Sequence, residues 1–488
     1  MSKLQEEGKA KMTNYRWTIV LMLFLATTVN YMDRQVLSLT WADFIAPEFH
    51  WTNSDYGTIT GLFSIFYAIS MLFAGKFVDW MDTKKGFLWA IGVWSFGAIL
   101  HAFCGLLTAG ITAGEWTLSF QGARQAIGTV GNISMVVNVS VTLFVFARLI
   151  LAIGEAGNFP AAIKATAEYF PKKDRAYATS IFNSGAQIGA LLAPLTIPFI
   201  AKAWGWEMAF IVIGALGFVW MGFWVFIYHK PEKNKRVNSV ELAYINQDDI
   251  TDAVQGTIPA DENAGRKVSF KKAFKYKQTW SFAVGKFLTD GVWWFLLFWI
   301  PAYLSSVYDL NSTQSAPHVF VVYAISMISV FAAGYFPAYF MNKKKMDPYQ
   351  GRMRAMLLFA FFPLLILLAQ PLGSISVWMP VIIIGIAAAA HQSWSANIFT
   401  TVSDMFPKHA VGTITGIGGM AGGVGSFFIN KSSGVLFDHA ANTNMKFLGY
   451  EGIESGYFII FIFCAIAYLL GWTIMKALVP KYELITDM

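Results

Sequence analysis

The run W-T-I-V-L-M-L-F-L-A-T-T-V-N-Y-M-D-R-Q-V-L-S-L-T-W, from Trp17 to Trp41, is apolar except for a short polar stretch. A helix of about 20 apolar residues is long enough to cross the hydrocarbon of a membrane. Asp33 and Arg34 lie inside this run. Because ionisable groups are costly at membrane depth, each of them is a candidate functional residue if the run spans a membrane.

The composition of the whole chain favours a membrane protein. Of its 488 residues, 56% are hydrophobic and only 13% are charged, whereas soluble domains carry about 25% charged residues. Apolar runs of about 20 residues recur along the chain, each long enough to span. We therefore expect an all-α polytopic membrane protein.

Twelve helices in two six-helix halves are expected. The longest hydrophilic interruption, residues 230–275, separates an amino-terminal bundle (1–229) from a carboxy-terminal bundle (276–488) and is interpreted as a central loop. A glycine-rich, semi-polar segment near 108–140 is expected to lie outside the membrane, since counting part of it as a further span would break the charge asymmetry of the later loops. The twelve segments are predicted at 17–40, 55–79, 86–107, 141–168, 176–201, 208–229, 279–306, 317–341, 354–371, 376–402, 411–434 and 455–478.

Lysines and arginines gather in alternate loops, which predicts that both termini and the central loop are cytoplasmic. This distribution accounts for the net charge of +7 without a nucleic-acid partner. Cys104 and Cys464 both lie in apolar context, so neither a disulfide framework nor a metal site is expected.

Polar residues inside the amino-terminal spans are the first site candidates. Asp33 and Arg34 are adjacent and therefore do not face each other on a helix, whereas Asn30 shares a face with both. Arg148 and Glu155 are seven residues apart and line one face of the fourth span. Each charge is either functional or a neutralising partner that locks helix packing.

Neutral and aromatic groups supply further candidates. Asn183 and Gln187, at positions i and i+4, suit sugar hydroxyls or hydrogen bonds between helices. Lys286 and Asp290 have the same spacing and either pair with each other or contact a substrate, with the pair as the favoured interpretation. Trp293 and Trp294 follow that pair, either to stack on a sugar ring or as ordinary membrane aromatics.

The segment A-H-Q-S-W-S-A-N in the tenth span favours a cavity lining. It contains His391, Gln392, Ser395 and Asn397. His391 is either a proton relay or a hydrogen-bonded filler.

A dinucleotide-binding pattern is set aside in favour of helix packing. G-I-G-G-M-A at Gly416 fits a dinucleotide fingerprint, but no strand precedes it. Gly418 with Gly422, and Gly419 with Gly423, have the spacing of close helix packing. No Walker A pattern occurs in the sequence, so nothing indicates an ATP-driven pump.

The loop G-K-F-V-D-W-M-D-T-K-K-G, residues 75–86, is similar to a signature of the major facilitator superfamily, with Trp80 where an arginine is usual. Y-M-D-R-Q, R-L-I-L-A-I-G-E-A-G-N-F-P, F-N-S-G-A-Q-I-G-A, G-K-F-L-T-D-G-V-W-W-F and A-A-A-H-Q-S-W-S-A-N together resemble the hexuronate transporters of the anion:cation symporter family. That resemblance implies proton-coupled uptake of glucuronate or galacturonate by alternating access across a bacterial inner membrane. Relatives in the wider family carry galactonate, sialate or glutamate.

The resemblance also implies residue roles. Arg34 matches the arginine that holds the substrate carboxylate, and Glu155 matches an acid of proton coupling, with Arg148 as its companion. Asp33 is either a protonatable competitor for Arg34 or only its neutraliser. Gln187, Asn397 and Tyr67 match residues that contact the sugar.

No cofactor is expected; the expected partners are a sugar acid, protons and membrane lipid, with the protein a monomer. Organic-anion exchange or efflux on the same fold, and a uronate receptor without transport, remain alternatives.

Overall fold

The computed structural model describes residues 11–248 and 269–486. The first part contains α2 (Arg16–Thr40), η2 (Trp41–Ile45), α3 (Ala46–Phe49), α4 (Asn53–Met81), α5 (Thr83–Ala113), α6 (Phe120–Gly128), α7 (Ile133–Glu155), α8 (Asn158–Tyr169), α9 (Lys172–Trp204), α10 (Trp206–Ile227), η3 (Pro231–Lys233) and α11 (Ser239–Ile245). The second contains α13 (Phe270–Ala273), α14 (Lys277–Tyr308), α15 (Ser312–Ser326), α16 (Ser329–Lys344), α17 (Pro348–Phe361), η4 (Phe362–Leu368), α18 (Ala369–Gly373), α19 (Trp378–Met405), α20 (Lys408–Thr443), a hairpin of β1 (Lys446–Phe447) and β2 (Tyr450–Glu451), and α21 (Ile453–Leu478).

All twelve predicted segments are helical, and the prediction of an all-helical polytopic protein is confirmed. Eleven segments of the described chain are long and apolar enough to cross a membrane. The twelfth, α2, is less apolar because of its polar residues, but it packs among the others, mainly against α9 and α10. Three predicted segments are broken: α7 with α8, α15 with α16, and α17 with η4 and α18.

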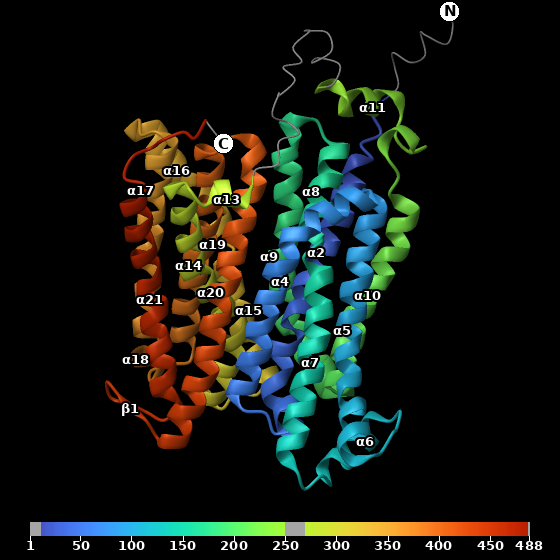
Figure 1. The fold of residues 1–488 in the computed structure, drawn as a ribbon, viewed down its shortest axis with the longest axis vertical. Coiled ribbons are helices and arrows are strands. Elements are labelled where there is room, and N and C mark those ends of the chain that lie inside the picture. The colour runs from blue at the N-terminus through green and yellow to red at the C-terminus, as the bar shows by residue number, and fades with distance from the viewer. Residues whose placement is uncertain (1–10, 249–268, 487–488) are drawn as a thin grey trace, which may run out of the picture.

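The glycine-rich segment between α5 and α7 does not form a further span. Its helix α6 has nine residues and is about 14 Å long, too short to cross a membrane. The predicted boundaries on either side were wrong, because α5 continues to Ala113 and α7 begins at Ile133. In Figure 1, α6 projects from the bottom of the bundle.

The cytoplasmic end of the bundle follows from the positions of its charged segments. The start of α2, the end of α21, and the helices α11 and α13 lie at one end, and α6 and the β1–β2 hairpin lie at the other (Figure 1). Since the lysine-rich loops gather at the first end, the positive-inside rule makes it cytoplasmic and makes the end with α6 external.

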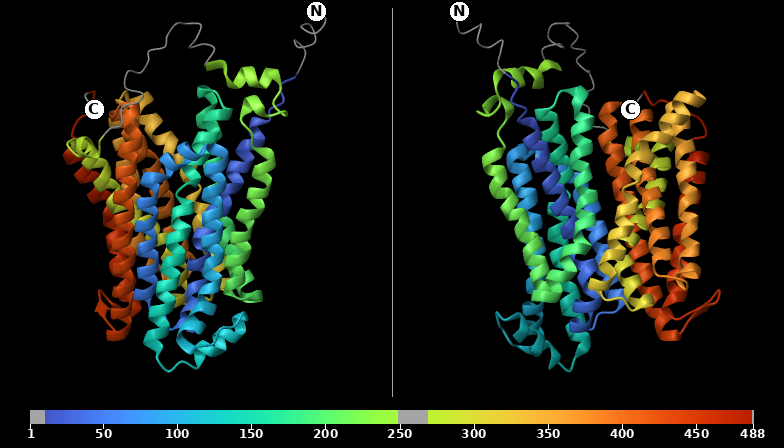
Figure 2. Two further views of the ribbon diagram at one scale, coloured as in Figure 1. Left: turned by 45° about the vertical axis from the view of Figure 1, so that its right-hand side comes forward. Right: turned by 180° about the vertical axis from the view of Figure 1, so that it is seen from behind.

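Helices before and after the central segment form two groups that stand side by side (Figure 2). The groups contact each other chiefly through α4 with α20, α9 with α15, and α2 with α14. A cavity between the groups is therefore bounded by residues far apart in the sequence.

Glycines of α20 allow its close approach to both groups. A Cβ at Gly418, Gly422 or Gly425 would overlap Phe282, Asp290 or Phe287 of α14, and a Cβ at Gly423 would overlap Ala68 of α4. The predicted close packing is confirmed at Gly418, Gly422 and Gly423. A Cβ at Gly419 would meet no neighbouring atom of the described residues within 4 Å, so the prediction fails there.

Replacing Gly425 by alanine is expected to destabilise the fold by about 1–3 kcal/mol, the usual range for overpacking. The added methyl group would meet the backbone carbonyl oxygen of Phe287, which no side-chain rotation can move away. The melting temperature of the purified protein in detergent measures the effect. Gly419→Ala is the matched control and should leave that temperature unchanged or slightly higher, since alanine favours helix.

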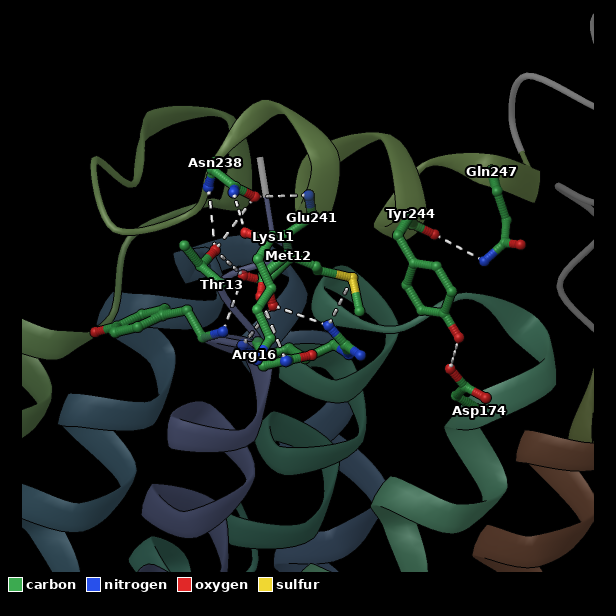
Figure 3. A network of polar contacts seen from close by, with 11 residues as sticks. Lys11, Met12, Thr13, Arg16, Asp174, Asn238, Glu241, Tyr244 and Gln247 are labelled. Carbon is green, nitrogen blue, oxygen red and sulfur yellow. Dashed lines mark hydrogen bonds and ion pairs between the residues drawn. The ribbon is translucent and has the colours of Figure 1, made fainter. Parts of the chain in front are cut away.

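The central segment caps the first helix (Figure 3). Glu241 of α11 accepts hydrogen bonds from the backbone N–H groups of Tyr15 (2.8 Å) and Arg16 (3.0 Å), and from the Arg16 guanidinium (3.1 Å). Burial raises the pKa of Glu241, but these backbone and side-chain donors outweigh burial and hold that pKa below its ordinary value. A carboxylate at a helix N-terminus is favourable because it satisfies free N–H groups and complements the helix dipole.

A second contact of α11 reaches the start of α9. The hydroxyl of Tyr244 donates to Asp174 at 2.6 Å. Because α2 carries Arg34 and α9 carries Asn183 and Gln187, α11 fixes the cytoplasmic ends of two helices that hold predicted site residues.

Candidate substrate and proton site

Arg34 forms a buried ion pair with Glu155. Its Nη2 and Nε atoms lie 2.6 Å and 2.9 Å from Oε2 of Glu155, and the side chains are 4% and 0% exposed. Within the described chain, Oε1 of Glu155 has no hydrogen-bond partner. The pair joins α2 to the last residue of α7, so the arginine of the opening stretch is held by a carboxylate 121 residues away.

The approach of α7 to its neighbour depends on small residues beside Glu155. A Cβ at Gly154 would overlap the backbone of Trp94 in α5, and one at Gly157 would lie 2.7 Å from the Cβ of Ala90. Glycine at these two positions therefore lets α5 and α7 pack closely.

Aromatic rings surround the Arg34 guanidinium. Its central carbon lies 4.7 Å from the ring centroid of Tyr67, 4.9 Å from Tyr31 and 5.1 Å from Trp294. These rings come from α4, α2 and α14, so both groups of helices contribute. Ring faces attract a cation, most strongly where water is excluded.

Asp33 makes no ion pair with Arg34. It is 1% exposed, and neither carboxylate oxygen has a hydrogen-bond partner among the residues described. The amide of Asn30 is likewise buried and unpartnered there. The prediction that Asp33 and Arg34 do not form one salt bridge is confirmed, as expected for adjacent residues of a helix.

Arg148 is a second buried arginine. All three of its side-chain nitrogens lack a hydrogen-bond partner within residues 11–248 and 269–486, and its guanidinium lies 5.1 Å from the ring of Phe63. Asp33 and Arg148 interact electrostatically without a direct bond. Buried charges without partners are costly, so such groups in a folded protein call for a functional reason or an ordered water.

A cavity of about 490 Å³ lies between the two helix groups. This volume is in the range of small-molecule sites, about 300–1,000 Å³. Five predicted residues line it: Asn183, Gln187, Trp293, Gln392 and Ser395. Its wall also includes Tyr31, Phe159, Ser180, Ser184, Ser329, Ala333, Ala396 and Phe399.

Arg34 is set back from the cavity wall by one side chain. The ring of Tyr31 lines the cavity, and the Arg34 guanidinium lies against that ring. Sequence reasoning missed Tyr31, although its position three residues before Arg34 places it on the same helix face.

His391 and Asn397 do not line the cavity. His391 stacks on Trp293 with ring centroids 5.2 Å apart, and its Nδ1 lies 2.7 Å from the Tyr468 hydroxyl. Asn397 donates to the carbonyl oxygens of Ala333 (3.0 Å) and Ser393 (2.9 Å). Both side chains therefore support the wall from behind, with Asn397 tying α19 to α16.

Lys286 and Asp290 pair with each other at 2.6 Å, which confirms the interpretation of a self-satisfying pair. The Lys286 ammonium also lies 4.1 Å from the ring of Phe399, so the pair lies one side chain behind the cavity wall. The structure thus places a charged pair behind an aromatic residue in each helix group.

Polar contacts between the two groups of helices concentrate near the external end. Asp438 accepts from the backbone N–H groups of Asn53 (2.9 Å) and Ser54 (2.7 Å), and Asp43 accepts from that of Ser312 (2.5 Å). Farther inward, the Tyr56 hydroxyl donates to the carbonyl oxygen of Phe298 at 2.8 Å. The external end is therefore closed.

On the cytoplasmic side, where the cavity lies, the two groups make weaker polar contacts. Across it, Gln187 and Ser326 are separated by 3.5 Å, and the lining residues Ser180 and Asn183 are exposed in the cytoplasmic part of α9. The arrangement is inward-facing.

Two groups of helices around a central cavity with polar and aromatic lining, closed at one end, are the arrangement of a secondary transporter. The chain belongs to the Major Facilitator Superfamily, whose sequence model matches residues 23–429. It is a multi-pass membrane transporter and not an enzyme.

Its relatives include sugar-acid transporters. The chain is 26% identical over 471 residues to the hexuronate transporter of Escherichia coli (strain K12), covering 96% of this chain and 95% of that protein. It is 26% identical over 339 residues to the galacturonate transporter of Dickeya chrysanthemi, covering 69% and 86%. It is also 26% identical over 451 residues to a probable galactarate/D-glucarate transporter of Escherichia coli (strain K12), covering 91% and 93%.

Solved structures share the fold. A bacterial homolog of the human lysosomal transporter Spinster, inward-facing and unoccupied, aligns with a TM-score of 0.68 at 18% identity, covering 97% of this chain and 99% of that chain. The D-xylose-proton symporter aligns with a TM-score of 0.66 at 16% identity, covering 96% and 100%. At these identities the likeness concerns the fold alone.

Proposed function

We propose that the protein is a proton-coupled symporter that takes up hexuronates such as glucuronate and galacturonate across a bacterial inner membrane. The observation that carries this proposal is the buried Arg34–Glu155 pair, one aromatic ring away from a cavity lined by neutral polar and aromatic side chains. The names of the three relatives support a sugar acid as substrate.

The proposed anchor for the substrate carboxylate is Arg34. A guanidinium binds a carboxylate through two parallel N–H donors. In the present structure Glu155 occupies two of those donors. A proton on Glu155 removes its negative charge and releases Arg34, and a displacement of Tyr31 then opens the path from the cavity to the guanidinium.

The sugar ring is proposed to bind in the cavity itself. Asn183, Gln187, Gln392 and Ser395 supply neutral donors and acceptors for hydroxyl groups, and Trp293 supplies a flat apolar face. His391 and Asn397 position this wall, while Tyr67 and Trp294 enclose Arg34.

Asp33 is proposed as a second proton-binding group. Among the described residues no donor bonds to its carboxylate, whereas a protonated carboxyl is neutral and tolerates burial. Arg148 is proposed to balance the charge when Asp33 and Glu155 are ionised. A loaded site that is nearly neutral can reorient at low cost.

The moving parts are proposed to be the bundles 1–229 and 276–488, linked by residues 230–275. Binding between two rocking halves is a general solution for secondary transporters. Since both sides of the cavity come from one chain, the proposed functional unit is a monomer in the membrane lipid.

A second candidate substrate is a sugar diacid. The galactarate/D-glucarate relative and the hexuronate transporter have the same sequence identity to this chain, 26%. The two candidates share the Arg34 anchor and differ in the chemistry at the far end of the substrate.

The experiment is a radiolabel uptake assay in proteoliposomes with glucuronate, galacturonate, galactonate, galactarate and glucose. We expect accumulation of a hexuronate driven by an inside-alkaline pH gradient, with alkalinisation of the outside when substrate is added. Glucose should not be taken up, because it lacks a carboxylate for Arg34. Binding of a uronate without flux would indicate a receptor, and flux without proton movement would indicate exchange.

A further inference from the structure

The external end of α2 turns a corner that reaches the carboxy-terminal group. The five-residue π-helix η2 follows α2 directly, and the single-turn helix α3 follows η2. We call Trp41–Phe49 the outer corner. Asp43 in this corner accepts from both the backbone N–H and the hydroxyl of Ser312, at the start of α15. The outer corner thus makes one of the contacts that close the external end.

The short helix α6 grips this corner from outside. Nε of Arg124 lies 3.0 Å from Oε2 of Glu48 in α3, and Nη2 lies 2.5 Å from Oε2 of Glu207 in α10. The indole N–H of Trp206 donates to Glu48 at 2.7 Å. Arg124 is 39% exposed, whereas the two carboxylates are 8% and 2% exposed, so one arginine from the surface joins two sheltered acids.

The outer corner depends on such contacts, because its own helices are very short. A single helical turn is unstable without tertiary contacts. π turns are rare in proteins, and those that occur are often found at functional sites. Trp41 stacks on Tyr56 of its own group at 4.1 Å, and it meets the ring of Trp299 in α14 edge-on at 6.1 Å. Arg124 holds the same corner through Glu48.

We propose that Arg124 of α6 is a positioning residue for the outer gate, which is the contact between Asp43 and Ser312. By holding Glu48, Arg124 fixes the outer corner so that Asp43 closes onto Ser312. This inference rests on the alternating access proposed above, but not on the identity of the substrate. It assigns a role to α6 as a clamp on the gate.

The clamp also contains a group that titrates near neutrality. Burial raises the pKa of Glu48 to about 7, although its hydrogen bond from Trp206 and the charge of Arg124 oppose that rise. When the corner is released into water, this carboxyl should return toward its ordinary pKa of about 4.3. The closed gate, in which Glu48 is buried, therefore binds the proton more tightly than the open one. Acid stabilises the closed gate, and this stabilisation is lost as the pH rises through about 7.

Four helices surround Glu48 and its helix α3, and two of them present charged groups to it. Arg124 faces it from α6 and Glu207 from α10, while α5 faces it with Gly105. α7 packs against α3 through the ring of Phe144, next to Phe49. An external cavity of about 650 Å³ beside Glu48 is also lined by Asp43, His50 and Lys202.

A cysteine below the gate reports its opening. Ser315 is 1% exposed and lines the same small cavity as Asp43 and Ser312. We would introduce Ser315→Cys after replacing the two buried cysteines, Cys104 and Cys464, by alanine. The measurement is the rate of labelling by an externally added, membrane-impermeant thiol reagent in substrate-free cells, divided by the rate for an exposed Lys446→Cys reference at the same pH.

Arg124→Gln is expected to raise the relative labelling rate by about tenfold, the factor that corresponds to losing a charge-assisted hydrogen bond. Lys202→Gln is the matched control, because it removes an exposed positive charge from the same cavity, and it should leave the rate unchanged. A rate for Arg124→Gln equal to the parent rate would overturn the proposal.

The pH profile separates positioning from general stability. In the parent, the relative labelling rate should rise as the external pH increases through about 7. Glu48→Gln keeps an acceptor for Trp206 but carries no charge at any pH, so its profile should be flat. A profile in Glu48→Gln with the parent's midpoint would overturn the proposal even if Arg124→Gln failed to fold. Because no substrate is present, these outcomes are independent of whether the protein carries hexuronates.

Discussion

Arg34→Lys is expected to lower the apparent affinity for a transported sugar acid by more than about tenfold, because a bidentate, charge-assisted contact becomes a single one. The structure shows the geometry that lysine lacks: two guanidinium nitrogens already approach one carboxylate oxygen, of Glu155, at 2.6 Å and 2.9 Å. The rings of Tyr31, Tyr67 and Trp294 enclose a flat cation, whereas an ammonium is a compact point charge.

The measurement is the concentration dependence of initial uptake in proteoliposomes, with the amount of folded protein determined by size exclusion. Arg352→Lys is the matched control. Arg352 also pairs with a carboxylate, Asp404, at 2.6 Å, but in the carboxy-terminal group at the cytoplasmic end. Wild-type affinity in Arg34→Lys would refute the role of Arg34 as carboxylate anchor.

Glu155→Gln is expected to abolish accumulation against a gradient while leaving exchange of substrate across the membrane. Glutamine has nearly the same shape and can accept a hydrogen bond from Arg34, so the site should stay assembled. It cannot exchange a proton, and it holds Arg34 less tightly because the buried ion pair is gone. The variant therefore resembles the protonated, substrate-accepting form at every pH.

Two assays on the same proteoliposomes separate these activities. Uptake driven by an inside-alkaline gradient should be lost, whereas counterflow with substrate on both sides should continue. Glu451→Gln, which removes an exposed carboxylate on the external hairpin, is the control and should retain both. A Glu155→Gln protein that still concentrates substrate would remove Glu155 from proton coupling and leave Asp33 as the remaining candidate.

Helix positions could be predicted because hydrocarbon thickness sets a length that a single sequence reveals. The breaks within the helices could not be predicted in this way. The break between Glu155 and Asn158, and the 3-10 stretch Phe362–Leu368, lie in apolar surroundings that differ little in hydropathy from intact helix. The start of α7 at Ile133 was missed for the opposite reason, since polar residues such as Asn132 and Ser134 resemble a loop.

The residue types of the candidate site could be predicted from the sequence. Which of these side chains face the cavity and which lie behind its wall could not. Cost at membrane depth singles out Arg34 and Glu155, and the structure brings them together. Which polar groups face the cavity depends on partners from other helices: Asn397 is turned to the carbonyl oxygen of Ala333, and Gln392, five residues earlier on α19, faces the cavity. The external clamp joins Glu48 to Arg124 across 76 residues with no pattern in the sequence to indicate it.

The cap on the first helix has a consequence for biosynthesis. Glu241, which satisfies the free N–H groups of Tyr15 and Arg16, is translated about 225 residues after them. α2 therefore enters the membrane before its cap exists, and its first turn reaches the final form only after α10 and α11 have left the ribosome. A protein expressed as two separate fragments should reassemble better when the first fragment ends after Asp248 than when it ends at Ile227, because only the longer fragment carries its own cap.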